Sequence, residues 1–196
     1  MVNEEYRSTP KSSVKWLNTL FFANLASIFL SLIALLPVGS GWTSWIGKLI
    51  SLVVIVACFG LAPEGVRYRR AAVCRLGILT IALFHTLFSV RTVLVLASSV
   101  LSFVALYQEY KGHAELIREA DRKLAGKWGR FFVLQIVCTL VISLVTAVVT
   151  VAVTMLLEPE AAVAAEIVAY VAEGEVLVMN VIYLNYLRRT IRLMRE

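Results

Sequence analysis

The chain has 196 residues, of which 60% are hydrophobic and 16% are charged, and its formal net charge is +6. A soluble domain has about 25% charged residues, so this composition excludes an ordinary soluble globular protein. The apolar residues gather in runs close to the roughly 20 residues that a helix needs to cross a bilayer. We therefore expect an all-α, polytopic integral membrane protein, a six-helix transmembrane bundle that forms a single membrane domain over residues 1–196, with one amphipathic cytoplasmic helix.

Six apolar runs follow one another along the chain. The first run is longer than the apolar core of a signal peptide, and no clear cleavage site follows it, so we expect a transmembrane helix there. The third and fourth runs meet at Arg91. Fused into one helix they would extend for about 55 Å, which is too long for a hydrocarbon core of about 30 Å. The expected spans are 16–36, 45–61, 71–90, 92–107, 131–157 and 162–187.

Basic residues are distributed unevenly between the two sides that six alternating spans create. If the N-terminus is cytoplasmic, every Lys and Arg except Lys48 and Arg91 lies on the cytoplasmic side, whereas several glutamates lie on the outer side. This distribution is the one that the positive-inside rule predicts. We therefore expect both termini to be cytoplasmic, in a membrane that we take to be the prokaryotic cytoplasmic membrane.

The longest connection, residues 108–130, is expected to form the amphipathic cytoplasmic helix. Ile117, Leu124 and Trp128 fall on one side of it, and Arg122 and Lys123 are among its basic residues. A basic helix with one apolar side lies along a membrane surface and attracts anionic lipid. A solvated connector that continues the fourth span fits the same pattern, and both interpretations stay open.

Polar residues within the expected spans are the candidates for a ligand or ion site, because such residues are costly in a bilayer and are often functional. A seven-residue repeat places Glu173 on one helix face with Glu166 and Asn180. The repeat predicts that Glu173 points into the bundle and that Glu175 points outward, although Glu173 can lie in a cavity or at the outer interface. The tentative ligand- or ion-binding residues are Glu173, Arg91, Tyr170, His85 and Asn24.

Several of these residues also have a purely structural explanation. His85 and Asn24 lie near the middle of their spans, where a hydrogen bond to a neighbouring helix accounts for them better than a ligand does. Glu109 and His113, spaced i, i+4, form half of a metal site, and an ion pair is the better interpretation. The three cysteines contain no C-x-x-C pair. We expect no metal site, no cofactor and no catalytic residue.

Two functions remain open for such a chain. No catalytic or phosphate-binding motif occurs, so we expect a non-catalytic accessory, sensor or immunity-type membrane protein. The alternative is a protein that binds or transports a small solute or ion through an outward-facing site near Glu173. In size and six-span layout the chain is similar to the substrate-binding subunits of vitamin importers of the energy-coupling type, a likeness of layout alone. The expected partners are the lipid bilayer, anionic lipid at the inner face, and a partner protein or a second copy of the chain, without nucleic acid.

Overall fold

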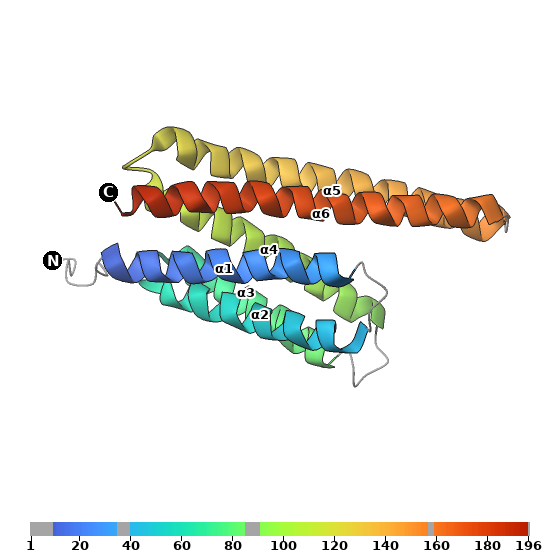
Figure 1. Cartoon of the computed structure of the whole chain (residues 1–196), viewed down its shortest axis with the longest axis horizontal. Helices are drawn as coiled ribbons and strands as arrows, with labels where there is room; N and C mark the ends of the chain where they lie inside the picture. The colour runs from blue at the N-terminus through green and yellow to red at the C-terminus, as the bar shows by residue number, and fades with distance from the viewer. Residues whose placement is uncertain (1–9, 35–39, 85–90, 157–158, 196) are drawn as a thin grey trace. The chain divides into compact units, whose positions relative to one another are not determined.

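The computed structural model describes residues 10–34, 40–84, 91–156 and 159–195, and these residues are helical apart from short turns. No strand occurs in these four ranges, so the expectation of an all-α chain is confirmed. In chain order the helices are α1 (Pro10–Ala34), α2 (Ser40–Gly60), the short 3-10 helix η2 (Ala62–Glu64), α3 (Val66–Phe84), α4 (Arg91–Ile117), α5 (Arg122–Leu156) and α6 (Pro159–Leu193) (Figure 1).

Five of these helices contain a segment that is long and apolar enough to cross a membrane. The segments are Ser12–Ile33, Trp42–Glu64, Val93–Ile117, Arg122–Ala152 and Ile167–Leu193. α3 is the long helix that does not meet this criterion over its described residues, because its first half is rich in arginine. The end of the expected third span, residues 85–90, lies outside the described part of the chain.

The chain divides into two compact units. Unit 1 comprises the chain up to Gly129 together with the segment from Leu184 onward, and unit 2 comprises residues 130–183. Within unit 1, α1 packs against α2, α2 against α3, and α3 against α4. Unit 2 is formed by the remaining lengths of α5 and α6, which run antiparallel to each other (Figure 1).

The contact between α1 and α2 depends on a glycine. The ring of Trp16 on α1 lies so close to Gly60 on α2 that a Cβ atom at Gly60 would overlap it. A residue without a side chain lets two helices approach closely in an apolar environment, where packing is the main force that joins them. Leu17 and Leu20 of α1 are fully buried beside this contact.

The amphipathic helix expected over residues 108–130 is wrong as a separate element. α4 runs on to Ile117, a short turn follows, and α5 begins at Arg122. The Asp121 carboxylate accepts a hydrogen bond from the backbone N–H of Leu124 at 2.9 Å, which is the N-cap interaction that starts a helix. The connector interpretation therefore holds for the part of this segment that continues α4.

The apolar side chains of that segment do not face a lipid leaflet either. Ile117 and Trp128 are 0% exposed and Leu124 is 4% exposed, whereas Arg122 and Lys123 are exposed. The turn reverses the chain, so one apolar stripe is shared by two antiparallel helices and is buried between them and the rest of unit 1. An apolar stripe identifies the buried side of a helix but not whether lipid or protein covers it.

Candidate functional site

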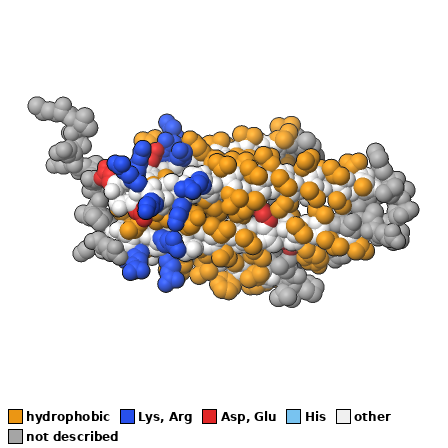
Figure 2. All heavy atoms as spheres, turned by 90° about the horizontal axis from the view of Figure 1, so that it is seen from above, with side chains coloured by type: hydrophobic (Ala, Val, Ile, Leu, Met, Phe, Trp, Pro, Cys, Tyr) orange, Lys and Arg blue, Asp and Glu red, His pale blue; other side chains and the backbone are white. Residues whose placement is uncertain are grey.

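Six helix ends meet at one end of unit 1, which we call the basic end. They are the beginnings of α1, α3 and α5 and the ends of α2, α4 and α6. The Ser13 hydroxyl of α1 donates a hydrogen bond to the Glu64 carboxylate of η2. Arg195, just beyond α6, donates to the Asn18 side-chain oxygen of α1 at 3.4 Å. Figure 2 shows Lys and Arg side chains gathered at one end of the visible face, with hydrophobic side chains over much of the rest.

A cluster of four polar side chains lies inside the basic end, and we call Tyr68, Arg75, Glu109 and His113 the buried polar cluster. The Nη2 and Nε atoms of Arg75 donate to one oxygen of Glu109 at 2.5 and 3.1 Å. The other Glu109 oxygen lies 3.9 Å from Nε2 of His113. The Tyr68 hydroxyl lies 2.8 Å from Nδ1 of His113. The cluster thus links α3 to α4 through a continuous chain of polar contacts.

Aromatic rings from α4, α5 and α6 cover the cluster. The ring of Trp128 stacks on His113 with centroids 4.7 Å apart, and Tyr110 and Tyr186 pack against the same indole. The indole Nε1–H of Trp128 donates to the Thr190 hydroxyl at 3.2 Å. This bond ties the start of α5 to the end of α6 within unit 1.

Burial and charge determine which members of the buried polar cluster are ionised. Glu109 is 1% exposed and His113 is 0% exposed, so the carboxylate depends on the Arg75 guanidinium for its charge compensation. Tyr68 precedes the expected third span, and burial, reinforced by the negative charge of Glu109, raises the pKa of its phenol well above the usual range. Tyr68 therefore keeps its hydroxyl proton. No buried side-chain N or O atom lacks a hydrogen-bond partner in the described residues, so the cluster is saturated by its own members and neighbours.

A different kind of site lies between the second half of α1, the first half of α2 and the second half of α3. A partly enclosed cavity of about 460 Å³ is formed there by one face of each helix. An adjoining cavity of about 430 Å³ lies between α2, α3 and α4. The polar residues of the first cavity are Ser27, Ser31, Ser44, Lys48, Ser51 and Arg75. The second shares Ser44 and Lys48 and adds Ser98 and Ser99.

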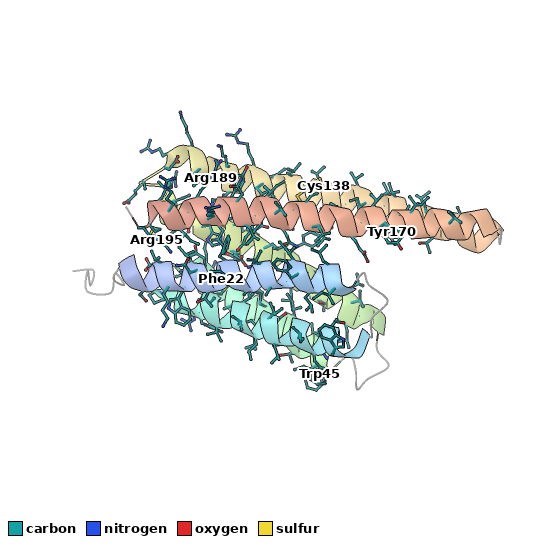
Figure 3. The ribbon with its side chains drawn as sticks, in the orientation of Figure 1. Phe22, Trp45, Cys138, Tyr170, Arg189 and Arg195 are labelled. Atoms are coloured by element: carbon teal, nitrogen blue, oxygen red, sulfur yellow. The ribbon has the colours of Figure 1, made fainter. Side chains whose placement is uncertain are left out.

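The tentative ligand residues near Glu173 behave differently from expectation. Glu173 is exposed and Glu175 is half-buried, which is the reverse of the orientation that the seven-residue repeat predicts. The Tyr170 side chain is 61% exposed on α6 (Figure 3). Tyr170 and Glu173 belong to unit 2, whereas Asn24 belongs to unit 1.

The other tentative residues have local roles or fall outside the described parts. The Asn24 amide donates to the Leu20 carbonyl of its own helix at 2.8 Å, so a bond within α1 meets its need for an acceptor. Arg91 begins α4, but its side chain and the whole of His85 lie outside what the structure describes. Among the described residues, no group of three or more His, Cys, Asp or Glu side chains is arranged to hold a metal ion.

Sequence reasoning missed most of the buried polar cluster and the cavity that Lys48 lines. The i, i+4 spacing of Glu109 and His113 did indicate a pair, but nothing in the sequence placed Tyr68 and Arg75 beside them. Lys48 was recognised only as a cation on the outer side, although its position inside an apolar run was a signal for an intramembrane site.

Comparison of the chain with models of protein families, with curated proteins and with solved structures finds no match in any of the three. The conclusions about function therefore come from the geometry of the chain itself.

Proposed function

We propose that the chain is a six-span membrane protein with both termini in the cytoplasm. We further propose that it acts without catalysis, as an accessory or sensor subunit whose basic end docks an acidic surface of a partner protein. Five helices that are long and apolar enough to cross a membrane support the first part. The convergence of the six helix ends within unit 1 supports an even number of crossings.

The observation that carries the docking proposal is the excess of exposed cations at the basic end. Exposed there are Arg69, Arg70, Lys111, Arg118, Arg122, Lys123, Lys127, Arg188, Arg189 and Arg192. The nearby carboxylates are fewer, and Glu109 is buried while Glu115 pairs with Arg67 at 2.6 Å. A surface of one sign attracts an oppositely charged partner and speeds its association.

A groove at the turn between α4 and α5 gives this surface a shape. Its volume is about 730 Å³, and its charged lining consists of Lys111, Glu115, Arg118, Glu119 and Arg122. Alternating charges in a groove favour an ordered peptide segment over a diffuse counterion layer, since each position prefers one sign of charge. We therefore favour a protein partner over anionic lipid as the occupant.

The test is the mass of the complex that the full chain forms in its native membrane, after extraction in a mild uncharged detergent. The variant R118E/R122E/K123E should release the chain from a heteromeric complex, and the charge-preserving variant R118K/R122K/K123R should leave the complex intact. A wild-type chain that migrates alone would refute docking, as would a complex unaffected by charge reversal. Association that follows only the anionic-lipid content of the membrane would replace the protein partner with a lipid surface.

A further inference from the structure

Lys48 is a half-buried cation in the apolar helix α2, eight residues after the helix start at Ser40. It lies twelve residues before the end of α2 at Gly60, which corresponds to about 18 Å of helix. Arg75 lies nine residues after the start of α3 at Val66, or about 14 Å along that helix. The two cations therefore occupy similar depths, and both line the cavity between α1, α2 and α3.

Among the described residues, one of these two cations has a carboxylate partner and the other has none. Arg75 pairs with Glu109. In the described part of the chain no carboxylate pairs with Lys48, whose ammonium lies 4.5 Å from the ring centroid of Trp45. A cation over an indole gains about 1 kcal/mol at an accessible site, and the ring carries no net negative charge that could neutralise the ammonium. The cavity thus carries one net positive charge that the described residues leave uncompensated.

Serine hydroxyls give the same cavity a second chemical character. The Ser27, Ser31 and Ser51 hydroxyls each donate to the backbone carbonyl four residues earlier, at 3.2, 3.0 and 2.9 Å. In the adjoining cavity Ser99 does the same at 2.9 Å. A hydroxyl that has used its hydrogen in this way still offers oxygen lone pairs as acceptors. The cavity walls therefore combine one cation that lacks a carboxylate partner in the described residues, Lys48, with several acceptors.

The geometry points to a binding site, and we propose that the Lys48 cavity binds a small organic anion that also carries hydrogen-bond donors. Its carboxylate or phosphate would pair with Lys48, and its hydroxyl or amine groups would donate to the serines. The volume of about 460 Å³ falls in the range of small-molecule sites. The anionic group can come from a free solute or from a lipid headgroup with hydroxyl groups, and the chemistry of recognition is the same for both. This site shares Arg75 with the buried polar cluster, but it does not involve the exposed cations of the basic end that the docking proposal uses.

The test has two arms, each with the purified full chain in uncharged detergent or in nanodiscs. In the first arm, equilibrium dialysis measures the binding of radiolabelled glycerol 3-phosphate. In the second, native mass spectrometry measures retention of phosphatidylglycerol after exchange into a neutral lipid. We expect saturable binding in one arm, and K48Q should weaken that binding by about tenfold or more, since it removes the charge partner of the bound anion.

Matched variants separate the charge, the cavity and the fold. K48R keeps the charge and should retain most of the binding. Gly47 lines the cavity, and a Cβ atom there would make only an ordinary contact of 3.6 Å with Leu30, so Gly47→Leu should fill the cavity and block binding with Lys48 still present. Lys15 lies 5.3 Å over the ring of Trp16 outside the cavity, so K15Q is the matched control and should change binding by less than about twofold.

A free solute and a lipid headgroup give different results in the two arms. Binding of glycerol 3-phosphate that phosphatidylglycerol does not displace identifies a free solute, and K48Q-sensitive lipid retention alone identifies a headgroup. Absence of saturable binding in both arms overturns the proposal. Equal loss in K48Q and K15Q, or unchanged binding in Gly47→Leu, also overturns it. Thermal melting of each variant shows whether the fold is retained, and K48Q should melt no lower than wild type because it removes a charge without a carboxylate partner.

Discussion

Arg75 and Glu109 join α3 to α4 in the interior of unit 1, with the guanidinium Nη2 atom 2.5 Å from the carboxylate. The same two helices carry a second ion pair, Arg67 with Glu115, at 2.6 Å. The Glu109 side chain is 1% exposed, whereas that of Glu115 is 51% exposed. One helix pair therefore contains a buried ion pair and its own solvent-exposed counterpart.

Removing Glu109 should destabilise the fold far more than removing Glu115. Glu109→Ala leaves the Arg75 charge in a poorly solvated position, and the expected loss in unfolding free energy is about 3 kcal/mol. Glu115→Ala should cost less than about 1 kcal/mol, since water compensates for the lost partner. Unfolding of the purified chain in mixed micelles with increasing denaturing detergent measures both. Equal losses would mean that the Arg75–Glu109 pair is effectively solvated. The double variant R75L/E109L should recover part of the stability that Glu109→Ala loses.

Tyr68→Phe should reduce the stability of the fold at neutral pH and should make the loss of stability at alkaline pH less steep. The change removes the hydroxyl partner of the fully buried His113 nitrogen, at an expected cost of about 1–3 kcal/mol. Because the fold raises the pKa of Tyr68, it favours the neutral phenol. The resulting stabilisation is complete below the unfolded pKa of about 10 and is lost as the pH rises above it.

Denaturation curves between neutral pH and pH 11 should therefore fall less steeply for Tyr68→Phe than for wild type. Tyr170→Phe is the control, because it also removes one phenol but from a side chain that is 61% exposed. Identical pH profiles for wild type and Tyr68→Phe would show that the fold does not favour the neutral phenol of Tyr68.

Gly60→Ala should separate α1 from α2. The added methyl group would overlap the Trp16 ring, so either the ring or the helix must move, and overpacking of this kind costs about 1–3 kcal/mol. Gly65→Ala is the matched control, since a Cβ atom there meets nothing within 4 Å and the backbone is extended. Thermal melts compare the two variants. Adding Trp16→Leu to Gly60→Ala should restore much of the loss, and failure of this rescue would place the strain elsewhere.

Topology can be measured with thiol reagents that do not cross membranes. In a chain whose native cysteines are replaced, a cysteine at Ser40 should react in intact cells, because the proposed topology places the start of α2 outside. A cysteine at Glu119, in the turn between α4 and α5, should react only after permeabilisation. The reverse pattern would show that the orientation inferred from the charges is inverted. Labelling of both positions in intact cells would contradict their proposed location on opposite sides of the membrane.

The positions of the helices were largely predictable, because apolar runs and the charges between them depend on the sequence locally. The split at Arg91 illustrates this, since the length of a fused helix alone argued for two helices, and α4 does begin at Arg91. The connection between α4 and α5 was not predictable in the same way. The stripe of Ile117, Leu124 and Trp128 indicated a buried face, but the reversal at Asp121 decided that protein rather than lipid covers it.

Most of the buried polar cluster could not be predicted from the sequence, for a related reason. Tyr68 and His113 are 45 residues apart, and Arg75 and Glu109 are 34 apart, so their meeting depends on how α3 and α4 are aligned. A shift of one residue along either helix would turn these side chains by about 100° and separate them. The same sensitivity explains the reversed orientation of Glu173 and Glu175, where a seven-residue repeat fixed which residues share a face but not which way that face points.

Unit 1 is discontinuous in the chain, and this has a consequence for biosynthesis. Its last members, Thr190 and Arg195, contact Trp128 and Asn18, which precede them by 62 and 177 residues. Translation proceeds from the N-terminus to the C-terminus. The contacts of α1 and of the start of α5 with the end of α6 can therefore form only after all of unit 2 has been synthesised. A nascent chain that stops before Leu184 would lack the acceptor of the Trp128 indole N–H and the Arg195 partner of Asn18, and quality-control factors could recognise these exposed groups. The end of α6 therefore completes unit 1, and the loss of the residues from Leu184 onward would remove contacts with α5 and with α1.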